Sequence, residues 1–266
     1  MFKFALYLLI SMILMVFLLP FIYAVSPYDL NPNAILEAPT MQHIFGTDRL
    51  GRDIFARILV GGQTSLIIGF LSAAIASCVG LFIGINAGFF KGQVDKSITI
   101  LIDLFLTFPT FFLLLALVSY IQASSLVLII VISITGWMGM ARLIRSESFA
   151  ISNKPYIKIL KLSNMNTYKI IFKYFAPLLA PIFLISFTFG VGGAILAESG
   201  LSFLGLGINP PQMSWGSLLS GGKAVIDIAW WVSFFPGLMI FIVTFCLMQI
   251  SDFLQSKANQ KEIQTT

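Results

Sequence analysis

The chain has 266 residues, of which 58% are hydrophobic and 10% are charged. Soluble domains average about 45–50% apolar and about 25% charged residues, so this composition, with a mean hydropathy of +0.95, indicates an integral membrane protein. The formal net charge of +5 would favour a nucleic-acid partner in a soluble domain. Here the basic residues lie at the ends of apolar stretches, where they set membrane orientation, so we expect no nucleic-acid partner.

Apolar stretches long enough to span a bilayer recur along the chain. A helix needs about 20 apolar residues to cross the hydrocarbon core, and six stretches approach that length: 4–24, 64–90, 98–121, 126–144, 176–197 and 230–254. The first exceeds the roughly 7–15 apolar residues of a secretory signal. We therefore expect a retained anchor helix, with the start of an external loop, in residues 1–43, although small residues at 24–26 leave a cleaved signal as the alternative.

Lys and Arg are unevenly distributed outside these stretches. With a cytoplasmic N-terminus, twelve of the 16 lie on the cytoplasmic side, and Arg49, Arg52, Arg57 and Lys223 lie outside. The positive-inside rule then places both termini in the cytoplasm, with residues 255–266 as a cytoplasmic tail. The external segments become 26–63 and 199–229, which we expect to form irregular lids or short interfacial helices.

Three glycines in the second stretch, Gly80, Gly84 and Gly88, recur every four residues. They share one helix face and allow a neighbouring helix to approach closely, so we interpret them as a packing surface. Cys78 and Cys246 lie inside predicted spans without disulfide or metal-ligand spacing, and we interpret them as packing residues too.

Two acidic residues are candidates for lining the transport pathway. Asp103 lies within the third stretch, ahead of Pro109, which should kink that helix. One interpretation is that this acidic group lines an aqueous path or binds a proton. The other is that it reaches water or pairs with Lys96 or Arg142. Glu198, at the outer end of the fifth stretch, faces a cavity or marks the membrane boundary.

The chain carries no catalytic constellation. Its single histidine, His43, makes no His pair, and H-E-x-x-H, G-x-S-x-G, Cys-cluster and P-loop motifs are absent from the sequence. We expect no enzyme activity, no cofactor and no metal site, so another chain must hydrolyse any ATP that drives this protein.

The sequence of the inner loop, residues 147–175, predicts two short helices. Pro155 suits the first position of a helix, and apolar residues alternate with Lys158 and Lys161 over 156–162, which predicts an amphipathic helix parallel to the membrane. Thr167 is expected to cap a second helix that runs to residue 175. The loop is either a solvated connection or a rigid lever that a partner pushes.

Residues 44–57, I-F-G-T-D-R-L-G-R-D-I-F-A-R, closely resemble a known signature. It is the F-G-T-D-x-x-G-R-D-x-x-x-R motif of the second, C-type permease subunit in oligopeptide, dipeptide and nickel ABC importers. Further matches lie at 198–207, E-S-G-L-S-F-L-G-L-G, at 210–211 and at 214–216, so the similarity extends from residue 44 to residue 252. The external motif residues are Phe45, Gly46, Thr47, Asp48, Gly51, Arg52 and Asp53.

The resemblance implies an all-α integral membrane protein with a MetI-like ABC transporter permease fold in residues 44–254, six transmembrane helices, and contact with membrane lipid. It also implies a homologous second permease subunit, two cytoplasmic ATPase subunits and an extracytoplasmic substrate-binding protein. Peptides, nickel or metal chelates would be the substrates. The alternatives from other classes are an ion-coupled secondary transporter and a non-transporting membrane scaffold.

In such permeases the loop after the fourth span couples to the ATPase through a pattern like Y-V-x-A-A-x-x-x-G. The residues aligned with this ATPase-coupling loop are Tyr156, Lys158, Ile159, Leu160, Lys161 and Asn164. Ile159 and Leu160 replace the two alanines, so the ATPase groove needs a complementary change. Asn164 replaces the glycine, and because Asn tolerates a left-handed backbone, the turn can be kept.

The external motifs are expected to shape the extracytoplasmic mouth. For Arg52 and Asp53 we favour a structural role, in which the two residues hold the loop together through an ion pair.

Overall fold

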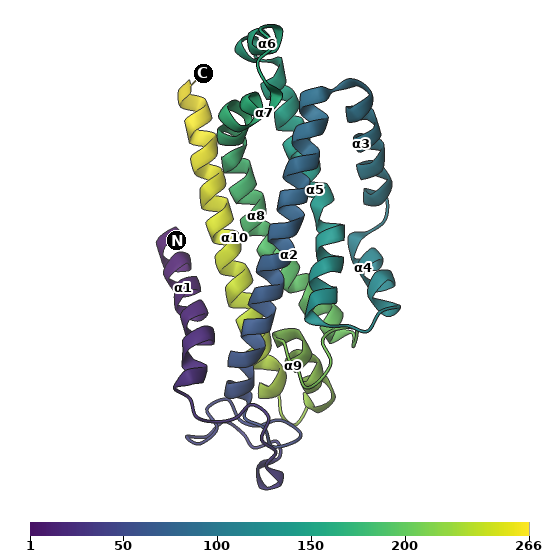
Figure 1. Cartoon of the computed structure of the whole chain (residues 1–266). Helices are drawn as coiled ribbons and strands as arrows, with labels where there is room; N and C mark the ends of the chain where they lie inside the picture. Colours follow the sequence, from purple (N-terminus) through teal and green to yellow (C-terminus); the bar gives the residue numbers. More distant parts are fainter. Residues whose placement is uncertain (266) are drawn as a thin grey trace.

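Four long helices stand side by side in this computed structural model: α2 (Ile54–Phe90), α5 (Ser125–Asn153), α8 (Ala176–Phe203) and α10 (Trp231–Thr265) (Figure 1). The structure describes residues 1–265, with side chains through residue 260, and no β-strand forms within that part. Helix α1 (Phe2–Leu18) packs against α10 and α2. The chain is therefore all-α, as predicted.

The number of membrane-spanning segments equals the predicted six when one broken span is counted. Within residues 1–265, five helical segments are long and apolar enough to cross a bilayer: Phe2–Phe21, Ile54–Phe90, Ser125–Asn153, Thr167–Phe203 and Trp231–Gln260. The sixth consists of α3 (Gly92–Leu106) and α4 (Thr110–Ser119), which are bent by 77° relative to each other. Pro109 immediately precedes α4, and because proline lacks a backbone donor, the predicted kink is confirmed as a break.

Two span boundaries differ from the predicted ones. Helix α2 begins at Ile54 rather than at residue 64, because Asp53 caps it: Oδ1 accepts a hydrogen bond from Ala56 N at 2.8 Å. The last span continues as one helix, so the predicted tail, 255–266, is helical as far as Thr265. Residue 266 of that tail lies outside the described residues.

The glycines of α2 make its contact with α5 unusually close. A Cβ added at Gly84 would lie 2.7 Å from the carbonyl oxygen of Ala141 and 2.7 Å from Cβ of Ile144. Gly80 and Gly88 meet α5 in the same way one turn to either side. The predicted packing role of this glycine series is confirmed.

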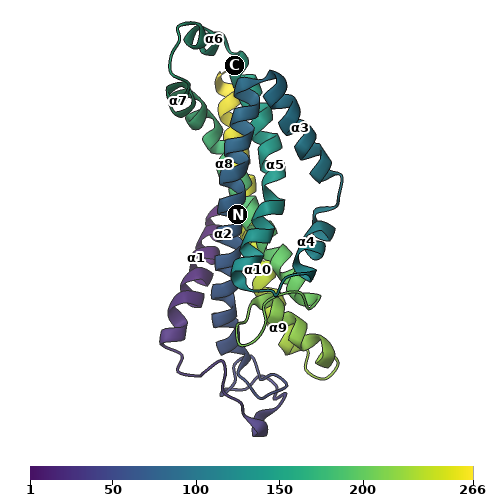
Figure 2. The same cartoon turned by 45° about the vertical axis from the view of Figure 1, so that its right-hand side comes forward.

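The two ends of the bundle carry different structures (Figures 1 and 2). The inner loop forms α6 (Pro155–Leu162) and α7 (Thr167–Ile170) at the end where α10 finishes, and a π-helical turn, Ile171–Phe175, leads into α8. The loop before α2 and the short helix α9 (Trp215–Gly222) occupy the opposite end. The predicted short helix in the second external segment is thus present.

Replacing Gly84 with Ala is expected to lower the free energy of unfolding of the isolated chain by about 1–3 kcal/mol, because the new Cβ overpacks the contact with α5. Gly139→Ala is the matched control: a Cβ there meets no described atom within 4 Å, and alanine favours a helix by about 1 kcal/mol over glycine. Unfolding in mixed detergent micelles measures both. Equal stability of the two variants would contradict close packing at Gly84.

Candidate functional site

A cavity of about 970 Å³ opens at the external end of the bundle. One wall is the loop before α2 together with the first turn of that helix, which contribute Tyr28, Asp48 and Arg57. The other wall is the connection between α8 and α9, within residues 205–213, and α9 itself. The two external motifs, far apart in the sequence, therefore face each other across one cavity.

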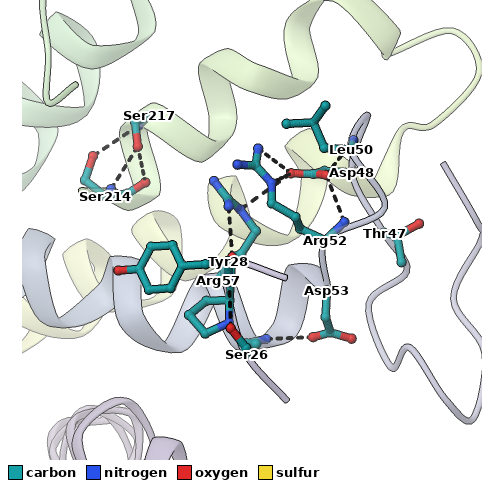
Figure 3. Close-up of polar contacts among 12 residues, drawn as sticks. Ser26, Tyr28, Thr47, Asp48, Leu50, Arg52, Asp53, Arg57, Ser214 and Ser217 are labelled. Atoms are coloured by element: carbon teal, nitrogen blue, oxygen red, sulfur yellow. Dashed lines mark hydrogen bonds and ion pairs between the residues drawn. The ribbon is translucent and has the colours of Figure 1, made fainter. Parts of the chain in front are cut away.

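Asp48 organises the first wall of the cavity (Figure 3). Its Oδ1 accepts hydrogen bonds from the backbone N–H of Leu50 at 2.8 Å and of Arg52 at 3.1 Å, and its Oδ2 accepts one from Arg52 Nε at 2.8 Å. Arg52 thus pairs with Asp48, and the predicted pair with Asp53 is wrong. Gly51, with φ of +71°, allows the tight turn that folds Arg52 back onto Asp48.

Asp53 is used instead at the start of α2. While its Oδ1 caps the helix, its Oδ2 lies 2.9 Å from Nδ1 of His43 and accepts a hydrogen bond from the Tyr23 hydroxyl at 3.3 Å. Burial, and then the Asp53 carboxylate, raise the pKa of Tyr23 to about 12. This carboxylate therefore joins the end of the first span, the external loop and α2.

The remaining motif residues fix the loop against α10. Gly46 has φ of +74°, and a Cβ there would lie 2.7 Å from Nε1 of Trp231. The backbone carbonyl oxygen of Thr47 accepts a hydrogen bond from Trp231 Nε1 at 3.3 Å. Phe45 stacks on an aromatic ring of α10 at a centroid distance of 3.9 Å. These contacts attach this part of the motif to α10.

Glu198 lies behind the cavity in an enclosure of serine hydroxyls. Its side chain is fully buried, with a relative exposure of 0%. Oε1 accepts from Ser202 at 2.7 Å and from Ser214 at 2.6 Å, while Oε2 accepts from Ser65 at 3.1 Å. The carboxylate thereby joins α8, α9 and α2. In this chain it faces neither the cavity nor solvent, and its predicted role in the pathway stays a prediction.

Asp103 makes one of the contacts that the sequence left open. It forms an ion pair with Arg142, and both side chains are more than half exposed. The pair links α3 to α5, since the two residues lie on different helices. A pathway role for Asp103 is not tested by this contact.

The inner loop follows the sequence closely, with one correction. Pro155 begins α6, and Asn164 has φ of +56°, so the left-handed turn that Asn was expected to maintain is confirmed. The cap of α7 is Asn166, whose side chain accepts from Tyr168 N at 2.9 Å. Thr167 is instead the first residue of the helix, so its assignment as the cap is wrong.

The two lysines of α6 have different environments. Lys161 Nζ donates to the carbonyl oxygen of Phe89 at 2.9 Å and to Ser152 Oγ at 3.0 Å, and lies 3.7 Å from the centroid of the Phe89 ring. Burial, and then nearby Lys91, lower the pKa of Lys161. Lys158 is exposed. The same loop exposes large apolar or aromatic side chains: Tyr156, Ile159, Leu162, Tyr168 and Phe172.

Comparison of the sequence with known proteins gives three findings. Residues 80–260 match the family described as binding-protein-dependent transport system inner membrane component. The chain is 32% identical to the oligopeptide transport system permease protein OppC of Haemophilus influenzae, over 95% of this chain and 84% of that protein. It is 35% identical to the dipeptide transport system permease protein DppC of Alkalihalophilus pseudofirmus, over 94% of this chain and 83% of that protein.

A solved structure of the MetNI methionine ABC transporter, in inward-facing conformations, also matches. The TM-score is 0.58 at 13% identity, and the match covers 74% of this chain and 96% of that one. This likeness confirms the predicted MetI-like fold.

Replacing Ser214 with Ala is expected to lower the free energy of unfolding by about 2 kcal/mol, since it removes the cap of α9 and one of the donors to the buried Glu198 carboxylate. Ser220→Ala is the control on the same helix, because that hydroxyl makes only a 3.3 Å contact with the carbonyl oxygen of Phe203. Titration with a denaturing detergent compares the two. A Ser214 variant as stable as the control would mean that the serine enclosure does not hold α9.

Proposed function

Because the chain belongs to the family of binding-protein-dependent transport system inner membrane components, we propose that it is a permease subunit of an ATP-driven peptide importer. An extracytoplasmic binding protein would deliver the substrate. The names of the two relatives support peptides over nickel or a metal chelate. The family also argues against an ion-coupled carrier, and Asp103, whose charge is balanced by Arg142, offers such a carrier little support.

The proposed complex contains a homologous second permease subunit. A groove of about 580 Å³ runs between α5 and α8 and includes Gly136, Gly139, Gly190 and Gly193. A Cβ added at Gly139 or Gly193 would meet no described atom within 4 Å. Gly139 and Gly193 therefore serve no close packing among the described residues, and small residues on such a face suit the approach of helices from another subunit.

The proposed complex also contains two cytoplasmic ATPase subunits, which hydrolyse the ATP. Helix α6 suits their docking because Tyr156, Lys158, Ile159 and Leu162 are exposed on it, while Ile157 is fully buried against the bundle. One face of this short helix is thus fixed to the permease and the other is open to a partner. This division carries the proposal that α6 is the coupling helix.

Lys161 supplies the connection from α6 to the membrane. Its ammonium group binds the carbonyl oxygen of Phe89, at the end of α2, and the Ser152 hydroxyl, at the end of α5. Helix α2 then runs without a break to Ile54 at the external cavity. In the proposed alternating-access cycle, ATP binding closes the ATPase pair, α6 shifts, and α2 carries the displacement outward to open the permease. ATP hydrolysis and the release of its products then return the permease to the inward-open state.

The direct test is reconstitution in proteoliposomes of the chain with its co-purifying subunits and binding protein. We expect a second permease and two ATPases to co-purify, and peptide uptake to require ATP. A chain that purifies alone in several mild detergents, or uptake that persists without ATP, would contradict the proposal.

Replacing Lys161 with Met is expected to reduce the peptide transported per ATP hydrolysed by at least about tenfold, because losing even one of its two hydrogen bonds costs about 1.5–3 kcal/mol, and about 1.4 kcal/mol is a factor of ten. The ATPases should still bind, since Lys161 faces the bundle. Lys158→Met removes the same charge from the exposed face and should leave this ratio unchanged. Simultaneous uptake and phosphate-release assays measure it, and an unchanged ratio in the Lys161 variant would rule out the connection.

A further inference from the structure

We propose that the external cavity binds the free carboxylate of a peptide substrate, with Arg57 as its main contact. The proposal rests on the peptide-importer function and specifies the chemistry by which this subunit recognises the substrate. It concerns the cavity between the two external motifs, not the binding protein's own site.

The cavity has an excess of positive charge. Three arginines line it, Arg49, Arg52 and Arg57, and among its described lining residues Asp48 supplies the one carboxylate. The guanidinium groups of Arg52 and Arg57 approach Asp48 together (Figure 3). A single anion therefore faces more than one cation, so the cavity attracts an anionic ligand.

Arg57 is buried and retains unused hydrogen-bonding capacity. Its side chain is 10% exposed, and Nη1 donates to the carbonyl oxygen of Pro27 at 3.1 Å. Its Nε lies 3.6 Å from Asp48 Oδ2, which is beyond hydrogen-bond distance, and has no hydrogen-bond partner among the described residues. Asp48 is already occupied, because it accepts from Leu50 and Arg52.

A ligand carboxylate fits this arrangement better than a neutral group. The planar guanidinium group donates two parallel hydrogen bonds to a carboxylate, and an unsatisfied buried donor is costly. Asn209 and Gln212 line the same cavity and offer partners for peptide amides. The volume of about 970 Å³ lies near the upper end of ordinary ligand sites, about 300–1,000 Å³.

The position of Arg57 favours binding of a small substrate over binding of a carboxylate on the surface of the binding protein. It is recessed in the wall, whereas Arg49 is exposed at the surface. An extended peptide terminus enters such a cavity more readily than a side chain on a folded surface does.

The test compares uptake of one peptide with a free C-terminal carboxylate and of the same peptide with a C-terminal amide, using the complete transporter and its binding protein. Arg57→Gln should reduce the ratio of the two kcat/KM values by about tenfold. Arg49→Gln should reduce it by about two- to threefold, because its exposed charge is screened by solvent. The binding protein is common to all variants, so its own preference cancels.

Lys223→Gln is the control, since it removes an exposed external charge that does not line the cavity. Its acid-to-amide ratio should equal that of the unmodified transporter. If Arg57→Gln does not fold, the ratio measured for Arg49→Gln tests the proposal. That variant should fold, because Arg49 is exposed and forms no ion pair among the described residues.

An unchanged ratio in the arginine variants would overturn the proposal. A second overturning result is an equal loss of uptake for both peptides with weaker association of the binding protein, which would assign the arginines to docking. Failure of the unmodified transporter to take up any peptide would instead contradict the peptide-importer function, so the two failures are distinguishable.

Discussion

Helix α2 packs so closely against α5 that a side chain larger than glycine has no room at Gly80, Gly84 or Gly88. The contact holds a helix of 37 residues, about 55 Å long at 1.5 Å per residue, in one position through the bundle. The external cavity lies beside its first turn, and the inner loop is attached to its last. In the proposed cycle, displacement at one end reaches the other only as far as α2 remains straight and stays packed on α5.

Polar groups at both ends of α2 are held by specific partners. At the external end Asp53 caps the helix, and Glu198 is held by hydroxyls from α2, α8 and α9. At the inner end the carbonyl oxygen of Phe89 binds Lys161. Because unpaired polar groups inside a membrane protein are costly, these contacts attach the external motifs and the inner loop firmly to the bundle. Arg57 differs from them, since its side chain lines the cavity and its buried Nε has no hydrogen-bond partner among the described residues.

Much of this architecture was predictable because it depends on local chemistry. The lengths of the apolar stretches predicted the membrane spans. Pro109 predicted the break between α3 and α4, and Pro155 predicted the start of α6. Asn164 adopts the left-handed turn that its short side chain permits. The glycine spacing in α2 predicted close packing, although not that α5 is the neighbour.

Other features depend on contacts between residues distant in sequence. Lys158 and Lys161 follow the same pattern along α6, and their environments differ because Phe89 and Ser152 approach Lys161. The predicted start of α2 lies too late in the sequence because a count of apolar residues does not detect the cap at Asp53. Two of the hydroxyls that enclose Glu198 come from Ser65 and Ser214, and no local pattern connects these two residues to it. The cavity itself forms only where the two external motifs meet.

The central claim is that α2 carries displacement from the inner loop to the external cavity as a rigid rod. Pulsed electron spin resonance tests it most directly, using spin labels in a chain whose Cys78 and Cys246 are replaced by serine and which is assembled with its partners. One label pair, at Ile67 and Phe90, which are both exposed residues of α2, reports the length of the rod. The other pair, at Leu50 and Gln212, reports the width of the cavity. Trapping the ATPases with nucleotide and vanadate should change the second distance and leave the first unchanged. A changed Ile67–Phe90 distance, or a cavity that keeps its width, would contradict the account.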